Sequence, residues 1–239
     1  MRKTTWYEKL NYVYNPFTIK PGFFNDEVIG YDKEIETLIK WVNKGEFAFL
    51  EGEYGQGKTT ILKYLINEFE GRRPVIYISR NRSDRAMNYK NLLVGAKGAF
   101  GRFFGIKAKN AFLIVDETEK INARDCADIL KYADEGNFHA VLFIDKSMKD
   151  SRLSKEVKKR IDKNVISLKS LHEKDAVALV RSRLDGNKEL ISDANIKKVF
   201  ARIPEKSTRT FLLAMEEVCR NAINHDRSSV TIDDLKVLN

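Results

Sequence analysis

Residues 52–60 have the types and spacing of a loop that binds phosphate groups. They read Gly-Glu-Tyr-Gly-Gln-Gly-Lys-Thr-Thr and match the P-loop pattern G-x-x-x-x-G-K-[ST]. Glycines let the main chain wrap closely around phosphate oxygens, and consecutive N–H groups at the start of a helix attract anions. The residues that we expect to bind a nucleotide are Gly52, Gly55, Gln56, Gly57, Lys58, Thr59 and Thr60.

Two side chains of this loop have specific predicted roles. Lys58 would reach the β- and γ-phosphates, and the Thr59 hydroxyl would bind Mg²⁺. The apolar run at 47–50 predicts a buried strand before the loop, and apolar residues at helical spacing over 61–66 predict a helix after it. A glycine-rich turn that carries a lysine by chance is the alternative interpretation. The strand–loop–helix context favours nucleotide binding.

A pair of acidic residues follows another apolar run, at 112–115. A buried strand there would hold Asp116 at its carboxyl end, where the carboxylate would bind Mg²⁺ directly or through water. Glu117 is one residue further along and would orient a water molecule for attack on the γ-phosphate. Two solvated acids at the end of a strand are the alternative. Together with the phosphate loop, the pair favours hydrolysis of a nucleoside triphosphate.

The elements that must position these residues alternate along the chain as far as residue 168. Apolar runs predict short strands, with helical patterns between them and an amphipathic helix before the first, ending near Gly45. Such alternation is typical of an α/β fold, with a parallel sheet and helices on both faces. The five predicted strands are 47–50, 75–78, 112–115, 141–144 and 165–168.

Only helices are predicted after residue 168. Ser170 and Glu173 form a possible capping box, and Ser192 or Asp193 would cap a second helix. Apolar residues from Phe211 onward predict a third helix, and the stretch before the C-terminus resembles a short last one.

The first thirty residues are aromatic and irregular, and a segment of this kind cannot form a core alone. We therefore expect it to pack across the domain that follows. The predicted organisation is an α/β nucleotide-binding domain at 1–169, which includes the aromatic segment 1–30 packed on it, and an all-helical domain at 170–239.

The P-loop combined with an Asp-Glu pair resembles the AAA+ ATPases. Asn15-Pro16-Phe17 and Ile29-Gly30-Tyr31 are similar to the adenine-side segment in the archaeal initiator and secretion-ATPase-like branches of that family. The resemblance covers nearly the whole chain. It implies a five-stranded α/β core with a helical lid, ATP and Mg²⁺ as ligands, hydrolysis of ATP to ADP and phosphate, and a ring or filament of identical subunits. We expect no winged-helix domain, because the chain ends with the lid, and this favours a remodeller, loader or helper role over sequence-specific origin recognition.

The same resemblance implies roles for three more residues. Asp145, after the fourth strand, would sense the γ-phosphate, with Ser147 as the alternative. Arg160 would be an arginine finger that reaches the site of a neighbouring subunit; Arg152 and a solvated basic helix face are the alternatives. Arg209 would contact the γ-phosphate from the lid. The family usually has Gly-x-Pro before this arginine, whereas this sequence has Ser-Thr.

The chain is basic, with 43 Lys and Arg residues against 34 Asp and Glu residues, and its net charge of +9 favours a polyanionic partner. Segment 80–109 combines basic and aromatic residues, which would suit phosphate contact and base stacking. Its charges face either nucleic acid or solvent, whereas Phe100, Phe103 and Phe104 are predicted to be the buried face of a helix. A second basic set spans 146–163. The basic residues of the first segment are Arg80, Arg82, Arg85, Lys90, Lys97, Arg102, Lys107 and Lys109.

The composition excludes a membrane-spanning or secreted disulfide-rich chain. Hydrophobic residues make up 43% and charged residues 32%, and no apolar run approaches the roughly 20 residues that span a bilayer. The N-terminus lacks the apolar core of a signal peptide. Cys126 and Cys219 lack metal-ligand spacing, so we interpret them as small buried residues in a reducing cytoplasm.

These features lead to one main functional hypothesis. It is an ATP-hydrolysing AAA+ ATPase that oligomerises and remodels, or loads onto, nucleic acid or a protein bound to nucleic acid, with DNA favoured over RNA. The alternative is a STAND-like signalling or assembly switch with slow turnover. A subunit that uses ATP only as a structural ligand is a third reading, and the intact Glu117 argues against it.

Overall fold

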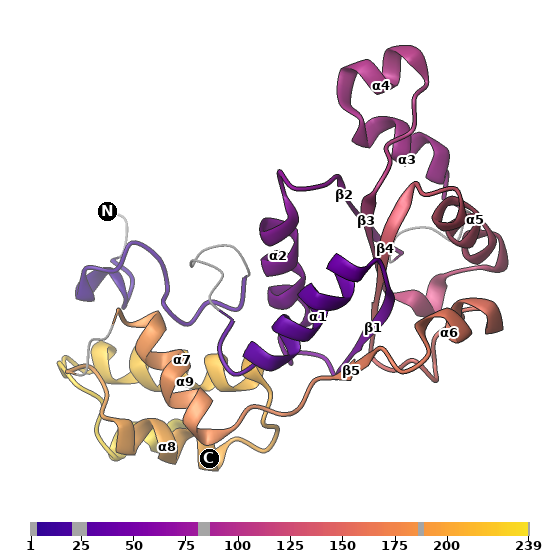
Figure 1. The fold of residues 1–239 in the computed structure, drawn as a ribbon. Helices are drawn as coiled ribbons and strands as arrows, with labels where there is room; N and C mark the ends of the chain where they lie inside the picture. Colours follow the sequence, from indigo (N-terminus) through magenta and orange to yellow (C-terminus); the bar gives the residue numbers. More distant parts are fainter. Residues whose placement is uncertain (1–3, 21–27, 81–86, 186–188, 239) are drawn as a thin grey trace. The chain divides into compact units, whose positions relative to one another are not determined.

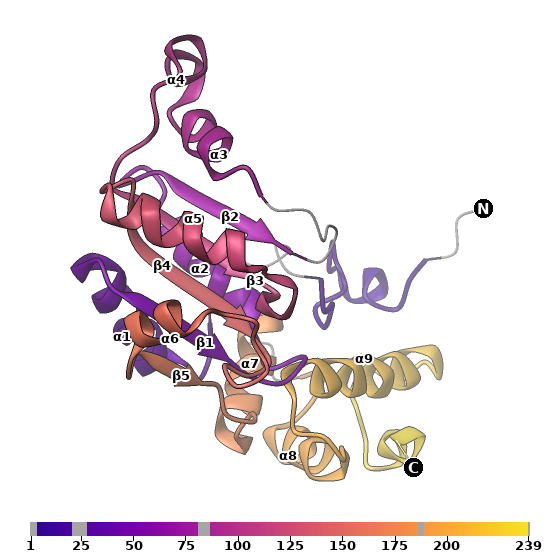
Figure 2. The same cartoon turned by 90° about the vertical axis from the view of Figure 1, so that its right-hand side faces the viewer.

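The computed structural model describes residues 4–20, 28–80, 87–185 and 189–238 (Figures 1 and 2). Packing divides the chain into two compact units. The sheet unit comprises Tyr31–Glu53 and Ile61–Leu168, and the helical unit comprises Met1–Gly30, Tyr54–Thr60 and Lys169–Asn239. None of the helices in the described ranges is long and apolar enough to cross a membrane.

The sheet unit is built on five parallel strands in the order β2-β3-β4-β1-β5. The central strands β1, β3 and β4 are buried along most of their length, as expected for strands covered on both faces. The predicted α/β fold with a five-stranded parallel sheet is confirmed, and each strand lies at its predicted apolar run. The strands are β1 (Phe47–Glu51), β2 (Val75–Ser79), β3 (Ala111–Asp116), β4 (Phe138–Asp145) and β5 (Val165–Ser167).

Helices cover both faces of this sheet (Figures 1 and 2). On one face lie α1 (Asp32–Lys44) and the part of α2 (Lys58–Phe69) that belongs to the sheet unit; on the other lie α5 (Ala123–Asp134) and α6 (Lys155–Ile161). Gly45 ends α1, as predicted. Its φ of 78° suits glycine, and a Cβ there would lie 3.0 Å from the His139 ring.

Two short helices, α3 (Tyr89–Ala96) and α4 (Gly98–Phe104), connect β2 to β3 and project from the sheet (Figures 1 and 2). We call residues 89–110 the α3–α4 hairpin. Tyr89 and Leu93 at its base are buried in the core of the sheet unit. Towards its tip, Phe103 is 84% exposed and Phe104 is 59% exposed. The hairpin is therefore anchored by α3 and presents the rings of α4 to solvent.

The burial predicted for Phe103 and Phe104 is wrong. Helix α4 has 7 residues and projects from the sheet (Figures 1 and 2), and both rings are largely exposed. The two rings instead pack edge-to-face on each other, with centroids 4.8 Å apart. The side chain of Phe100, together with Arg82 and Arg85, lies outside the described residues.

The helical unit packs α7 (Glu173–Arg183), α8 (Asp193–Arg202) and α9 (Thr208–Asn224) around one apolar core. The N-terminal segment contributes Trp6 and Phe17 to this core; their rings stack at 6.2 Å with an interplanar angle of 9°. The Tyr12 hydroxyl also donates to the Leu184 carbonyl at 3.2 Å. The prediction that the aromatic segment packs on the α/β domain is thus wrong for Trp6 and Phe17, because these residues pack against apolar residues of the helical unit.

The ends of these helices test the predicted caps. Helix α7 begins at Glu173 without a side-chain cap, so the predicted capping box, which needs the glutamate in the third helical position, is wrong. Ser192 caps α8 by accepting the N–H of Asn195 at 3.3 Å. The predicted last helix is a 3₁₀ helix, η3 (Asp233–Leu238). That residues 170–239 form a separate domain stays a prediction.

Both cysteines are buried free thiols, as predicted from their helical spacing. Cys126 lies on α5 in the sheet unit, and Cys219 lies on α9 in the helical unit. Burial raises the pKa of each thiol, which disfavours the reactive thiolate.

Arg80 and Asp125 form an ion pair inside the sheet unit. The Arg80 Nη2 atom lies 3.2 Å from Asp125 Oδ2, and both side chains are 0% exposed. Asp125 also accepts N–H groups of Met87 at 2.9 Å and of Asn122 at 3.2 Å, so its carboxylate joins the start of α5 to the chain before α3. The expectation that Arg80 faces solvent or a polyanion is therefore wrong, because its charge is neutralised within the unit.

We predict that Asp125→Ala destabilises the protein by about 3–5 kcal/mol, because the substitution leaves the buried Arg80 charge unpaired. The matched control is Asp134→Ala, on the same helix. Its ion pair with Arg160 has side chains 67% and 41% exposed and should contribute less than about 1 kcal/mol. Urea unfolding measures both free energies. If both variants lose the same free energy of unfolding, burial of the Arg80–Asp125 pair does not increase its contribution to stability.

Candidate nucleotide-binding site

The predicted phosphate loop has the backbone geometry that its glycines suggested. Gly55 and Gly57 have φ values of 85° and 93°, in the left-handed region that glycine adopts without strain. Helix α2 begins at Lys58, directly after the second of these glycines, and the N–H of Thr60 donates to the Gly57 carbonyl at 2.9 Å. The loop therefore leads into a helix N-terminus, where phosphate groups bind favourably.

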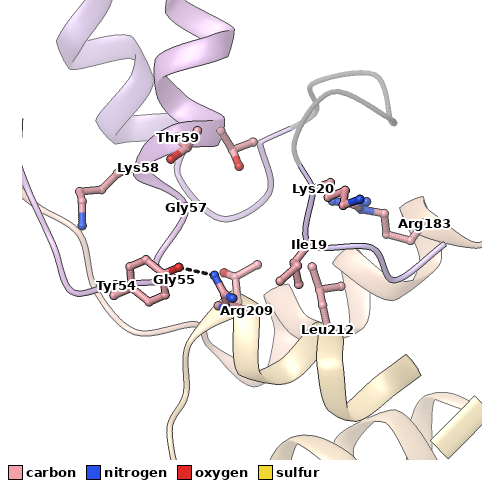
Figure 3. A pocket seen from close by; sticks show the side chains of 12 residues that line it. Ile19, Lys20, Tyr54, Gly55, Gly57, Lys58, Thr59, Arg183, Arg209 and Leu212 are labelled. Carbon is pink, nitrogen blue, oxygen red and sulfur yellow. Dashed lines mark hydrogen bonds between the residues drawn. The ribbon is translucent and has the colours of Figure 1, made fainter. Parts of the chain in front are cut away.

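A pocket in the helical unit brings this loop together with residues that lie far away in the sequence (Figure 3). The loop supplies Lys58 and Thr59, the N-terminal segment supplies Ile19, α7 supplies Arg183 and α9 supplies Arg209. Two predicted groups of site residues, the phosphate loop and the lid arginine, are thus placed around one pocket. The remaining lining residues are Lys20, Tyr54, Gly55, Gly57, Thr60, Thr208 and Leu212.

Arg209 is held against the loop by three contacts. Its guanidinium donates to the Tyr54 hydroxyl and lies over the Tyr54 ring, 4.8 Å from the centroid (Figure 3). The main-chain N–H of Arg209 donates to the Gly55 carbonyl at 3.3 Å. A Cβ at Gly55 would come within 2.9 Å of Arg209 Cβ, so the close approach of α9 requires glycine there. Sequence analysis missed Tyr54, because it occupies a position where the loop pattern accepts any residue.

The predicted acidic pair lies at the end of β3 in the sheet unit. The Asp116 carboxylate accepts a hydrogen bond from the Tyr77 hydroxyl at 3.2 Å. Glu117 has a left-handed backbone with φ of 60°, which is uncommon for a residue other than glycine and tends to occur at functional sites. Its Oε2 atom accepts from the Ser79 hydroxyl at 2.9 Å. Each carboxylate is therefore held by a residue of β2 that the sequence did not single out.

Asp145 ends β4, and its carboxylate accepts three hydrogen bonds. Oδ2 accepts the Thr118 hydroxyl and the Glu119 N–H, each at 2.7 Å, and Oδ1 accepts the Lys146 N–H at 2.7 Å. These bonds tie β4 to the turn that follows Glu117. The proposed sensing role of Asp145 stays a prediction, as does that of Ser147, whose hydroxyl accepts the Lys149 N–H at 3.1 Å.

The two candidate finger arginines differ in their surroundings. Arg160 donates to Asp134 Oδ1 at 2.6 Å and lies over the Phe47 ring, 4.8 Å from the centroid, so it packs on its own sheet unit. Arg152 is exposed, and its side chain forms no ion pair with any residue in the described ranges. The finger role of either residue stays a prediction.

Thr59 in the helical unit and Asp116 in the sheet unit each carry an oxygen donor of the kind that suits Mg²⁺. Mg²⁺ prefers oxygen ligands and is usually held by one or two protein groups plus phosphates and waters. The Thr59 hydroxyl and the Asp116 carboxylate are such groups. Within the described residues, no group of three or more His, Cys, Asp or Glu side chains could hold a metal ion alone.

The geometry defines a P-loop α/β protein, and comparison of structures narrows this class. No protein-family model matches the sequence, and no curated protein does. Solved structures do match. Cdc6p from Pyrobaculum aerophilum matches with a TM-score of 0.67 and 14% identity over 93% of this chain and 69% of that chain. ORC1 from Aeropyrum pernix, solved in complex with DNA, matches with a TM-score of 0.68 and 13% identity. The match covers 94% of this chain and 68% of that chain.

The RuvB Holliday junction branch migration motor from Thermotoga maritima matches with a TM-score of 0.66 and 14% identity, over 90% of this chain and 70% of that chain. These matched structures are AAA+ P-loop ATPases, and this chain spans about two thirds of each. At such low identity the likeness concerns the fold. The chain has the AAA+ fold, and the predicted resemblance is confirmed at that level.

We predict that Tyr77 keeps its proton at pH values where an ordinary tyrosine, with a pKa of about 10, loses it. Burial, followed by the charge of Asp116 and the hydrogen bond to it, raises the pKa of Tyr77 to about 12. Because the folded-state pKa exceeds the unfolded one, the stability contributed by Tyr77 is complete below about pH 10 and is lost as the pH rises towards 12.

NMR titration of protein labelled at tyrosine Cζ measures this pKa, with Tyr77→Phe assigning the resonance. Asp116→Asn should lower the pKa of Tyr77 but leave it above 10, because the burial remains. Titration of Tyr77 near pH 10 in the unmodified protein would contradict the prediction.

Proposed function

We propose that the chain is an AAA+ ATPase that binds ATP with Mg²⁺ and hydrolyses ATP to ADP and phosphate. The observation that carries this proposal is the pocket in which Lys58 and Thr59 of a P-loop and Arg209 of α9 line one cavity. The AAA+ fold and the Asp116–Glu117 pair at the end of β3 support it.

Each site residue has a role in this proposal. The main chain of residues 52–60 binds the phosphates, and Lys58 and Arg209 neutralise their negative charge. Thr59 and Asp116 hold Mg²⁺, which when bound draws charge from the phosphate oxygens. Asp145 senses the γ-phosphate.

Glu117 orients the attacking water and accepts its proton. Ser79 donates to Glu117 Oε2 at 2.9 Å and thereby orients this carboxylate, while lone pairs remain on both oxygens to accept a proton.

We further propose that the protein acts as a homo-oligomer in which an arginine of one subunit completes the site of the next. Arg160 would have to leave Asp134 and Phe47 before it could reach a neighbour. Arg152 is exposed and would need no such exchange with the described residues, which makes it the better-placed of the two candidates.

The α3–α4 hairpin is the proposed contact with nucleic acid or with a protein bound to it. Residues 87–110 contain no Asp or Glu, and Lys97, Arg102 and Lys109 are exposed close to Phe103 and Phe104 in the sequence. Cations would contact phosphates and the exposed rings would stack on bases. Stacking requires unpaired bases, which favours a single-stranded segment of DNA over an intact duplex.

A STAND-like switch is the alternative function. It shares the nucleotide pocket but turns ATP over slowly and does not respond to a polymer. Measuring the rate of ATP hydrolysis with and without single-stranded DNA, duplex DNA and RNA separates the two. Stimulation by one polymer supports the main proposal, and tight retention of nucleotide without stimulation supports the switch.

We predict that Glu117→Gln lowers the rate of ATP hydrolysis by about 10²–10⁴-fold and leaves ATP binding intact, because it removes a general base and keeps the size of the side chain. Lys58→Ala should weaken ATP binding itself. Glu119→Gln is the matched control; Glu119 is exposed and two residues away. A rate unchanged in Glu117→Gln would refute the catalytic assignment.

We predict that replacing Phe103 and Phe104 together by Ala weakens binding of single-stranded DNA by roughly tenfold or more, since stacking contributes about 1–3 kcal/mol per base. Leu213→Ala, which removes an apolar side chain that is 45% exposed in the helical unit, is the control. Fluorescence anisotropy at one fixed salt concentration measures the affinities. Equal binding of single-stranded DNA by both variants would show that the α3–α4 hairpin is not part of the nucleic-acid-binding surface.

A further inference from the structure

Tyr54 is a polar aromatic residue of the phosphate loop whose side chain contacts Arg209. The residue is 73% exposed, so it contributes little to any core. Its ring and its hydroxyl nevertheless both contact the guanidinium of Arg209 (Figure 3). An exposed tyrosine that makes two contacts with one arginine is suited to holding that arginine in place.

The two contacts leave part of the guanidinium available. Arg209 Cζ lies over the Tyr54 ring, 4.8 Å from the ring centroid, and Nη1 donates to the hydroxyl. An arginine has five N–H donors around the edge of its plane, so Nε and Nη2 keep donors that can bind phosphate oxygens. Stacking and phosphate binding by Arg209 are therefore compatible.

The backbone supports the same arrangement. The N–H of Arg209 donates to the Gly55 carbonyl at 3.3 Å, one residue after Tyr54 in the loop. The loop thus fixes Arg209 at its main chain and at the end of its side chain. A long flexible side chain fixed before the ligand arrives loses less conformational entropy when the ligand binds.

We propose that Tyr54 is a positioning residue that orients Arg209 towards the terminal phosphate and thereby sets the preference for ATP over ADP. This inference rests on the proposed function of the pocket as an ATP site. Tyr54 itself needs no contact with the nucleotide; it acts through Arg209. The preference arises because an arginine aimed at the γ-phosphate gains a partner from ATP that ADP lacks.

The test measures dissociation constants for a non-hydrolysable ATP analogue and for ADP by calorimetry. In Tyr54→Leu the ATP analogue should bind about tenfold more weakly, and ADP less than about twofold more weakly. Tyr54→Phe keeps the ring contact, so its affinity for the ATP analogue should lie between that of Tyr54→Leu and that of the unmodified protein. Tyr14→Leu, at another exposed tyrosine of the helical unit, is the control and should leave both constants unchanged.

A double-mutant cycle with Arg209→Ala shows whether Tyr54 acts through Arg209. If it does, Tyr54→Leu has no further effect on the ATP analogue once Arg209 is replaced. Additive losses, or equal losses for ATP and ADP, would assign Tyr54 a packing role and overturn the proposal. Tighter ATP binding in Tyr54→Phe would overturn it too, since it would make the tyrosine a competitor of the phosphate.

Failure of the proposed function has a different signature. If the unmodified protein binds neither nucleotide, the proposed ATP site and the proposed role of Tyr54 are both wrong, and no variant has to be measured. If it binds both but does not hydrolyse ATP, the catalytic proposal fails while the binding test of Tyr54 still decides its own question.

Discussion

The main-chain hydrogen bonds between parallel strands are the interaction on which the sheet unit depends. They fix a register in which Glu51 pairs with Asp145, and Ser79 pairs with Asp116. Because parallel strands run in the same direction, their last residues meet at one edge of the sheet. Apolar residues fill most of β1, β3 and β4, and each of these three strands ends at a carboxylate. A row of carboxylates at one edge follows from this register.

Carboxylates at one edge repel one another, and the structure stabilises them with donors from β2 and from the turn that follows Glu117. Tyr77 donates to Asp116, Ser79 donates to Glu117, and Thr118 donates to Asp145. Hydrogen bonds to an ionised carboxylate stabilise its charge and fix its orientation. Nearby, the buried Arg80 donates its N–H to the Asp116 carbonyl at 3.1 Å, which connects the acidic edge to the interior ion pair.

The sequence was enough to predict elements but not their distant partners. Apolar periodicity located the five strands, and the loop pattern located the glycines and Lys58, because both depend on neighbouring residues. Periodicity does not specify which surface an apolar residue meets, so Phe17 was assigned to the wrong unit and Phe103 to a core. Ser79 and Tyr54 were missed because their roles arise only from side chains brought close by folding.

The phosphate loop and α9 depend on each other for their local structure. The first N–H groups of a helix have no partners within it. In α9, the main-chain N–H of Thr210 donates to the Ser207 hydroxyl oxygen at 3.1 Å. The main-chain N–H of Arg209 donates to the Gly55 carbonyl at 3.3 Å. The loop thus caps the helix that carries its arginine, and any residue larger than glycine at position 55 would collide with that helix. The main chain of the loop is therefore coupled directly to the main chain at the start of α9.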